Sequence, residues 1–264
     1  MTTATKKYTE EQHLVAGKKA HLVKGGKGPP LLVLNHEVGS FGWTPFLEGL
    51  AENYSVYQPH HPGFDKSERP EWMRSVRDLA IAHEWLLRDL KLGPVDVIGL
   101  GFGGWVAAEM ATMNHSQFKH LVLVAPMGIQ PPPGTGEIVD QELLSGHEYM
   151  RKCFHDQAKL DAMFGKEPAI DQLEAWEINR EMTTRIAWKP YMFNQTLPYL
   201  IQGVQVPTLV VFGKQDQVAP LSCGKRYVDL LPKAKLEIVD NAGHCVEMEQ
   251  PQALLKLVTS FLAK

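Results

Sequence analysis

The chain has 264 residues, of which 44% are hydrophobic and 22% charged, and its formal net charge is −3. This length and composition fit a globular domain with a full hydrophobic core, and they exclude a fibrous or disordered chain. The near-balanced charge, without a stripe of Lys and Arg, argues against nucleic acid as a partner.

The N-terminal residues 1–10 are polar and lack the apolar core of a signal peptide, which predicts a frayed arm. No run of about 18 apolar residues occurs, because glycines interrupt the longest candidate, residues 95–113. The spacing of Cys153, Cys223 and Cys245 fits neither a disulfide framework nor a zinc site. We therefore expect a cytoplasmic protein without a membrane segment, a metal or another cofactor.

Short β-rich runs alternate with helical patterns along the first half of the chain, which indicates a parallel sheet with crossover helices. Residues 95–99 and 121–125 are nearly continuous apolar runs, as expected for neighbouring central strands that are covered on both faces. The alternating segments are residues 31–35, 44–53, 55–58, 75–90, 95–99 and 104–113.

This alternation breaks at Pro126, and residues 137–197 form a helical stretch rich in Met, Trp and charged residues, which indicates an insertion. Strand and helix patterns resume at residues 206–213, 236–239 and 250–262. We predict an α/β fold with an eight-stranded, mostly parallel sheet and a helical lid. The predicted parts are a core of residues 1–126, a lid of residues 127–200 and a second part of the core, residues 201–264.

A glycine-rich segment, residues 99–105, lies between a predicted buried strand and a predicted helix. Gly99, Gly101 and Gly104 match the dinucleotide pattern G-x-G-x-x-G, but that interpretation needs an acidic residue about 20 positions further on. The chain has Ala, Pro and Met at residues 125–127. We therefore disfavour a dinucleotide site.

The same segment also fits a nucleophile elbow, G-x-S-x-G, a sharp turn whose central residue is strained and exposes its side chain. Small flanking residues are needed for steric reasons, and Gly99 and Gly103 meet that need. The central residue is Gly101, which has no side chain to attack with. Glycine relaxes the strain of the turn, so the turn is expected to persist without its nucleophile.

Two further residues follow predicted strands in the order expected of a catalytic set. Asp216 follows the strand of residues 208–212, and His244 follows that of residues 236–239. In hydrolases that have a nucleophile elbow, the elbow comes first along the chain, the acid second and the histidine third. An Asp bonded to Nδ1–H of an imidazole fixes its tautomer and leaves Nε2 free to move a proton. The simpler interpretations are a turn-forming Asp and a structural His.

These motifs together resemble the α/β-hydrolase superfamily, over residues 12–263. Residues 35–40, with Trp43, are similar to the oxyanion loop of that family, and residues 60–67 are similar to its Pro-Gly-x-Gly-x-Ser loop. The resemblance implies a lid of helices over the active site. It also implies that the backbone N–H groups of Val38 and Phe102 form the oxyanion hole.

The chain departs from this family pattern at three positions. Gly101 removes the nucleophile, Glu37 replaces a glycine of the oxyanion loop, and His60 stands where an acidic residue is common. A carboxylate at Glu37 would oppose a developing negative charge, or act as a further acid/base group, or hold a cation. The predicted pocket residues are His36, Glu37, His60 and, from the lid aromatics, Trp188.

The favoured function is hydrolysis or lysis of an ester, lactone or C–C bond in a small apolar or aromatic molecule. The Asp216–His244 pair would work as a general base without a covalent serine intermediate, with a pKa near the imidazole range. Two alternatives stay open: a non-catalytic ligand-binding protein, or a serine hydrolase with an engineered Gly101. Restoring a serine there is expected to give esterase activity. The protein is expected to be a monomer or a homodimer.

Overall fold

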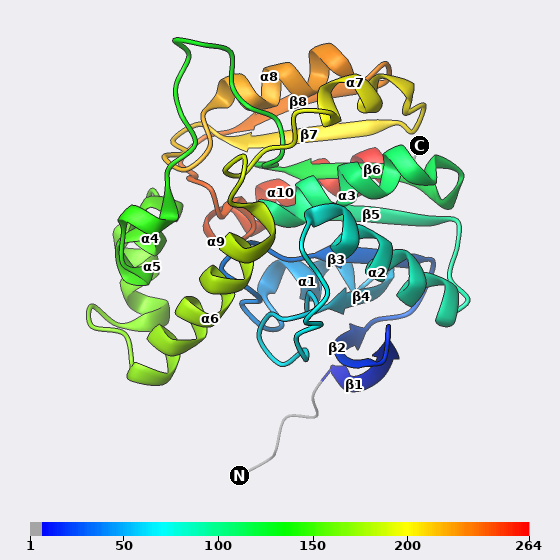
Figure 1. Ribbon diagram of the computed structural model, residues 1–264, viewed down its shortest axis with the longest axis horizontal. Helices are drawn as coiled ribbons and strands as arrows, with labels where there is room; N and C mark the ends of the chain where they lie inside the picture. The colour runs from blue at the N-terminus through cyan, green and yellow to red at the C-terminus, as the bar shows by residue number, and fades with distance from the viewer. Residues whose placement is uncertain (1–6, 264) are drawn as a thin grey trace.

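The computed structural model describes residues 7–263, which form one eight-stranded sheet with helices on both faces (Figure 1). The strand order is β1-β2-β4-β3-β5-β6-β7-β8. β1 and β4 each pair antiparallel with β2, and all other neighbours are parallel, so the predicted sheet is confirmed. The strands are β1 (Tyr8–Val15), β2 (Lys18–Gly25), β3 (Pro30–Leu34), β4 (Ser55–Pro59), β5 (Val95–Leu100), β6 (Phe118–Val124), β7 (Thr208–Gly213) and β8 (Ala234–Val239).

The predicted N-terminal arm is partly wrong, because Tyr8 already pairs with Gly25 at the start of β1. Residues 1–6 of the predicted arm lie outside the described residues. Among residues 7–263, no helix is both long and apolar enough to cross a membrane.

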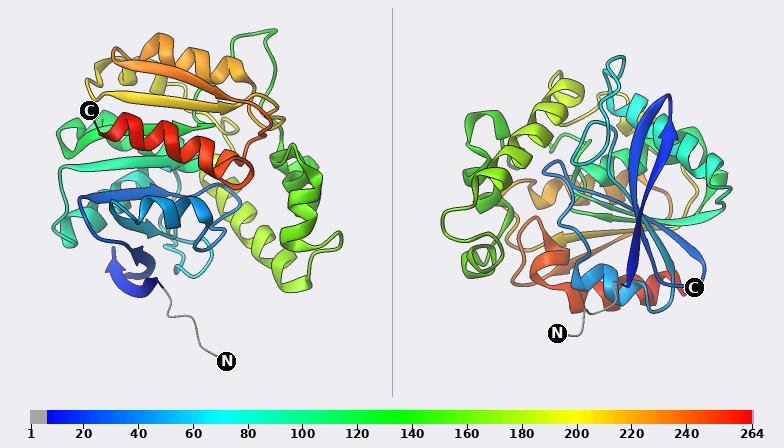
Figure 2. Two further views of the ribbon diagram at one scale, coloured as in Figure 1. Left: turned by 180° about the vertical axis from the view of Figure 1, so that it is seen from behind. Right: turned by 90° about the horizontal axis from the view of Figure 1, so that it is seen from below.

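Helices cover the two faces of the sheet and one of its ends (Figures 1 and 2). On one face, α2 and α3 pack on each other and α3 packs on β5, whereas α1 and α10 pack together behind the sheet. The helices are α1 (Pro45–Leu50), α2 (Val76–Asp89), α3 (Phe102–Met113), α4 (Gly146–Cys153), α5 (Gln157–Phe164), α6 (Ile170–Ala187), α7 (Leu197–Leu200), α8 (Leu221–Leu230), α9 (Val246–Glu249) and α10 (Pro251–Leu262).

Alternation along the central strands produces the two layers of the core. In β3, Leu32 and Leu34 pack toward the face covered by α2 and α3, while Leu31 and Val33 pack toward α1 and α10. All four side chains are buried. Burial of alternate residues on both faces is expected of a parallel sheet that is covered by helices on each side.

Residues 125–207, all of them described, add no strand to the sheet and carry α4, α5, α6 and α7. Figure 1 shows α4, α5 and α6 together beyond one end of the sheet, where the loops that follow the parallel strands also lie. The division into core and lid at residues 127 and 200 remains a prediction, but these helices cover the loops that carry the predicted site residues.

Candidate active site

The turn between β5 and α3 has the geometry of a strained elbow. Gly101 has φ 51° and ψ −113°, a conformation that side chains rarely adopt, and it stands directly before the first residue of α3. A Cβ built on Gly101 would collide with His36 Nδ1 and lie 2.9 Å from Glu37 Oε2 and 3.0 Å from His244 Nε2. The three groups therefore surround the space that a side chain at this position would enter.

Asp216 and His244 form the hydrogen bond that their order in the sequence predicted. His244 Nδ1 lies 2.9 Å from Asp216 Oδ2, and because a carboxylate only accepts, Nδ1 carries the proton. The other oxygen, Oδ1, accepts from the backbone N–H groups of Val218 (2.8 Å) and Ala219 (3.0 Å), which fixes the carboxylate at the end of β7. The Nε2 side of the ring therefore faces Gly101.

Glu37 is the residue that changes the chemistry of this space. Its Oε2 accepts from the backbone N–H of Phe102 at 3.2 Å, which is one of the two predicted oxyanion donors. Its Oε1 accepts from Tyr149 Oη at 2.9 Å and lies 3.6 Å from His244 Nε2. The Glu37 carboxylate therefore occupies the Phe102 N–H, which the family resemblance assigns to stabilising a developing oxyanion.

His36 completes the cluster from the loop after β3. Its Nε2 lies 3.0 Å from Glu247 Oε1, so Nε2 carries the proton and Nδ1 bears a lone pair. Nδ1 lies 3.9 Å from Glu37 Oε2. His36, Glu37 and His244 offer ligand atoms within 4.8 Å of one another, and so do His36, Cys245 and Glu247. These are the metal-competent groups of histidine, cysteine and carboxylate side chains among residues 7–263.

The cluster is sealed from solvent and carries separated charges. Glu37 and His244 are each 0% exposed. Burial alone would lower the pKa of His244, but the charge of Asp216, the hydrogen bond to it and the charge of Glu37 outweigh burial and raise the pKa to about 10. Burial would raise the pKa of Glu37, but the charges of His244 and His36 and the hydrogen bonds to the carboxylate together outweigh burial, and the pKa is lowered. At neutral pH, His244 is therefore a cation between two carboxylates.

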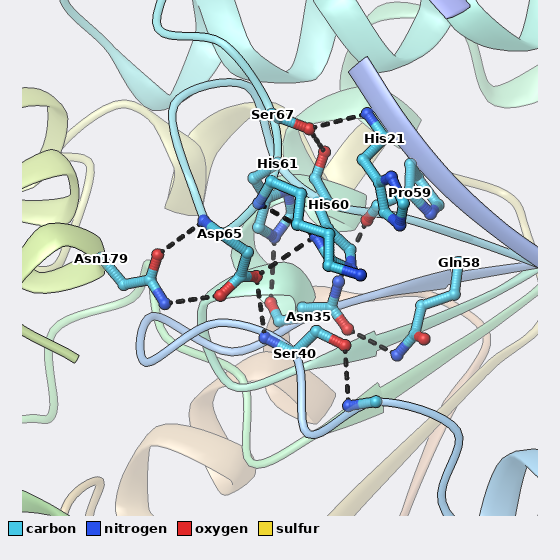
Figure 3. A network of polar contacts seen from close by, with 12 residues as sticks. His21, Asn35, Ser40, Gln58, Pro59, His60, His61, Asp65, Ser67 and Asn179 are labelled. Carbon is cyan, nitrogen blue, oxygen red and sulfur yellow. Dashed lines mark hydrogen bonds and ion pairs between the residues drawn. The ribbon is translucent and has the colours of Figure 1, made fainter. Parts of the chain in front are cut away.

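His60 lies outside this cluster, in a second polar network that Figure 3 shows beside Asp65 and Asn179. His60 Nδ1 lies 3.8 Å from Asp65 Oδ2, and burial lowers the pKa of His60 to about 3, so the ring is neutral. His60 and Asp65 line a cavity of about 430 Å³ together with Ser40, Trp43 and other residues of the loops and α6. His60 therefore lines a cavity other than the buried cluster, and a role for it in the active-site pocket remains a prediction.

Asn179 of α6 ties this network to the loop that carries Glu37. Its Nδ2 donates to the Val38 carbonyl and to Asp65 Oδ1, each at 2.8 Å, and its Oδ1 accepts from the Asp65 N–H at 2.9 Å. Gly39 permits this approach, because its φ is 93° and a built Cβ would collide with Asn179 and Asp65. Val38, predicted as the second oxyanion donor, is therefore held in place through its carbonyl by the inserted helix.

The predicted pocket residue Trp188 lies away from the cluster, and Cys245, which follows His244, is chemically inert. Trp188 is 49% exposed at the end of α6, and its ring contacts Tyr191, so it does not line the buried cluster. Cys245 is buried, and burial raises the pKa of its thiol well above the usual range, so it is not a thiolate nucleophile.

The sequence did not reveal three residues that form hydrogen bonds at or next to the site: Tyr149, Glu247 and Glu249. Tyr149 donates to Glu37, Glu247 accepts from His36, and Glu249 Oε2 accepts from the N–H of Gly243 at 2.6 Å. No short motif contains Tyr149 and Glu37, which are 112 positions apart. The position of Glu247, three residues after His244 at the start of a helix, was the only available sign.

Comparison with known proteins defines the class of protein that has this fold and these loops. A sequence profile of the Alpha/beta hydrolase family matches residues 31–257, and the chain belongs to this family.

Similar proteins include hydrolases that are named for the compound each one hydrolyses. The 2-hydroxymuconate semialdehyde hydrolase of a Pseudomonas species is 26% identical over 270 residues, covering 95% of this chain and 93% of that protein. The 2-hydroxy-6-oxo-2,4-heptadienoate hydrolase of Pseudomonas putida is 25% identical over 285 residues, covering 95% of each. A meta-cleavage product hydrolase from Pseudomonas fluorescens superposes with a TM-score of 0.80 at 22% identity, over 96% of this chain and 97% of that one. The structural likeness supports the fold.

Proposed function

We propose that the protein is a small-molecule hydrolase that cleaves an ester, lactone or C–C bond by direct attack of water, without a covalent enzyme intermediate. The observation that carries this proposal is the position of Glu37, whose carboxylate lies between the Phe102 N–H and His244 Nε2, beside a glycine. A base and an acid therefore flank the space in which a covalent nucleophile is missing.

The charges of the cluster assign the proton-transfer roles differently from the sequence-based hypothesis. That hypothesis made His244 a general base, but a His244 with a pKa of about 10 holds its proton at neutral pH. Glu37, whose pKa is lowered, is then the group in its basic form. Asp216 stabilises the imidazolium and orients it, as the acid of a Ser-His-Asp triad does.

In the proposed step one water molecule attacks a substrate carbonyl, with Glu37 as the base and His244 as the acid. Glu37 takes a proton from water as the water oxygen bonds to the substrate carbonyl carbon, and the C–O or C–C bond to the leaving group breaks. His244 gives its Nε2 proton to the leaving oxygen or carbon. Transfer of the proton from Glu37 to His244 then restores the resting charges. General acid/base help of this kind contributes about 10²–10⁴-fold, so the carbonyl must already be reactive.

The substrate class is suggested by the relatives and by the space beside the cluster. Two relatives are named for hydrolysis of 2-hydroxymuconate semialdehyde and of 2-hydroxy-6-oxo-2,4-heptadienoate, which are small, activated carbonyl compounds. The cavity of about 430 Å³ beside α6 is within the range of small-molecule pockets, about 300–1,000 Å³. Access from it to Glu37 requires the contacts of Asn179 to open.

A panel of activated esters, lactones and 2-hydroxy-6-oxo-dienoates, followed by mass spectrometry, tests the proposal. We expect steady turnover without a burst of product, because no enzyme-bound acyl group forms. Glu37→Gln and His244→Gln should each lower kcat by about 100-fold or more. His120→Gln is the matched control, since His120 also pairs with an aspartate (Nδ1 to Asp96 Oδ1, 2.9 Å) but lines neither the cluster nor the cavity, and it should keep most of the turnover.

The seal around the cluster favours one competing function, a ligand-binding protein without catalysis. In that case compounds of the panel bind beside α6 unchanged, and Glu37→Gln and His244→Gln leave binding intact. Such a result would overturn the hydrolase proposal. The third possibility, an engineered Gly101, is disfavoured because a side chain there would collide with His36.

A further inference from the structure

We propose that His36, Glu37 and His244 form a binding site for one divalent transition-metal ion of the zinc type. This inference goes beyond the proposed function, because an ion on Glu37 and His244 would itself hold the attacking water, and the ion-bound protein would use these side chains as ligands instead of as base and acid. The binding itself is argued from the cluster. No sequence motif indicates this site, because His244 lies 207 positions after Glu37 along the chain.

Two imidazole nitrogens point into the cluster without a hydrogen-bond partner from residues 7–263. Within the described residues, His36 Nδ1 and His244 Nε2 are both buried and have no hydrogen-bond partner. The distal nitrogen of each ring is bound to a carboxylate, Glu247 for His36 (3.0 Å) and Asp216 for His244 (2.9 Å). An ion would displace the proton that His244 Nε2 carries at neutral pH, and both inward-facing nitrogens would then donate lone pairs.

Carboxylate–histidine pairs of this kind are typical of metal sites. A ligating histidine almost always donates its other N–H to a carboxylate, carbonyl or water, which fixes the tautomer and makes the ligand more basic. Here two histidines carry such a carboxylate and both point at a third carboxylate, Glu37. Two histidines, one glutamate and one open position make up a ligand set of catalytic zinc sites.

The distances allow closure around an ion. His36 Nδ1 and His244 Nε2 lie 3.9 and 3.6 Å from the nearer Glu37 oxygens, and the three ligand atoms all lie within 4.8 Å of one another. Ligands bonded to zinc at about 2.1 Å in a tetrahedron are about 3.4 Å apart. The donor atoms therefore need to approach one another by at most about 1.4 Å to bind an ion.

The absence of a side chain at Gly101 leaves space for an ion between His36, Glu37 and His244. A Cβ on Gly101 would collide with His36 Nδ1 and come within 3.0 Å of both other ligands. A serine at this elbow and an ion on these three ligands are therefore mutually exclusive. Metal-bound water has a pKa near 7 in such sites, so the ion would supply at neutral pH the nucleophile that the elbow lacks.

The second candidate group, His36, Cys245 and Glu247, is less suited to an ion. It would use His36 Nε2, whose proton is already donated to Glu247. The Cys245 thiol is hydrogen-bonded with Cys153, and burial raises its pKa well above the usual range, which opposes the thiolate that a metal needs. The two groups share His36 but differ in every other ligand, which makes them separable by mutation.

The test is metal content and affinity of the intact protein. We would strip it with a chelator, load it with Zn²⁺ and measure bound zinc by mass spectrometry, affinity by calorimetry, and the visible spectrum with Co²⁺ in place of zinc. We expect one ion per chain and a rise in Tm. His36→Gln, Glu37→Gln and His244→Gln should each lose the bound ion and the rise in Tm.

Three further variants locate the site and act as controls. Asp216→Asn and Glu247→Gln should weaken the affinity about 10–100-fold, as expected for partners that orient a ligand. Cys245→Ser and His60→Gln should bind zinc like the parent protein. If one ligand variant fails to fold, the remaining variants still decide the outcome.

The inference is overturned if the parent protein binds no stoichiometric zinc, or if Cys245→Ser loses the ion while His244→Gln keeps it. Stoichiometric binding without hydrolysis of any panel compound would leave the site standing and overturn the proposed function. If the chelator-stripped protein hydrolyses a panel compound but takes up no zinc, the metal site is overturned and the proposed function stands.

Discussion

The molecule contains two buried histidine networks with opposite electrostatics, and both include residues of the loop after β3. His244 lies between Asp216 and Glu37, which raise its pKa to about 10 against the effect of burial. His60 and His61 are buried as well, but without a dominant carboxylate, and burial lowers their pKa values to about 3 and about 4. One network therefore holds a cation at neutral pH and the other holds neutral rings.

The difference follows from the partners of each ring. His61 Nε2 lies 3.0 Å from the Asn35 carbonyl and its Nδ1 lies 2.7 Å from His83 Nε2, so its neighbours are neutral groups that hold a neutral ring (Figure 3). Neutral polar networks position loops at little electrostatic cost. Charged clusters are costly to bury and are common where proton transfer or metal binding is needed. The cluster at Gly101 is thus the better candidate for chemistry.

The largest expected effect comes from removing the cation of the charged network. His244→Gln leaves Glu37 and Asp216 buried without their shared counter-charge, and breaking a buried pair in this way costs about 3–5 kcal/mol. The free energy of unfolding in urea measures it. His61→Gln, in the neutral network, should cost only about 1–3 kcal/mol, the effect of unpaired polar groups. Equal losses in the two variants would contradict the assigned charges.

Opposite pH dependences should distinguish the two networks in chelator-treated protein. The folded pKa of His244 is about 10 and its unfolded value about 6.5, so its stabilisation is complete below about pH 6.5 and is lost as pH rises toward 10. The folded pKa of His60 is about 3, so its neutral form favours folding above about pH 6.5, and stability is lost as pH falls toward 3.

Urea titrations from acid to alkaline pH check both slopes. Asp216, Glu37 and the Cys153 thiol are the groups whose charge acts on His244. His244→Gln should remove the alkaline loss of stability, and His60→Gln should reduce the acid loss. An alkaline slope that persists in His244→Gln would show that another group causes it.

The sequence predicted the fold and the Asp216–His244 part of the charged network, because both depend on short motifs along the chain. Strand ends, glycine turns and the order of Gly101, Asp216 and His244 are encoded in short motifs, and the Asp216–His244 hydrogen bond follows from them. Contacts between distant segments are not encoded in this way. The donation from Tyr149 to Glu37, and the approach of Glu37 to Phe102, depend on how α4 and the loop after β3 meet.

The same limit explains why the expected charge of His244 was wrong and why His60 was grouped with it. The charge of Asp216 and its hydrogen bond raise the pKa of the buried His244 most, and Glu37 adds a second anion that no motif places there. His60 follows a neighbouring strand end, yet its ring turns toward Asp65 and the cavity beside α6.

A smaller effect is expected from filling the elbow. Gly101→Ser should destabilise the protein by about 1–3 kcal/mol, since the backbone there has φ 51° and the side chain collides with His36. It should not create an esterase, in contrast to the sequence-based expectation, because Glu37 still lies on the Phe102 N–H. The double variant Glu37→Gly, Gly101→Ser frees that donor and should gain burst turnover of an activated ester. Activity in the single variant would contradict this account.

The smallest effect is expected where the two networks are joined, at Asn179. Its side chain is 1% exposed and links α6 to Asp65 and to the Val38 carbonyl, next to Glu37. Asn179→Ala removes these bonds, and a buried side chain left without a partner costs about 1–3 kcal/mol, less if water replaces it. Because the contacts cross from the inserted helix to the loops, the loss should appear as local opening rather than global unfolding. Hydrogen exchange of the amides of residues 38–40 and 63–65 should accelerate, while those of β5 and β6 stay protected. Glu174→Ala, an exposed change on the same helix, is the matched control and should leave exchange unchanged. Faster exchange in β5 as well would mean that Asn179 stabilises the whole fold instead of closing the site.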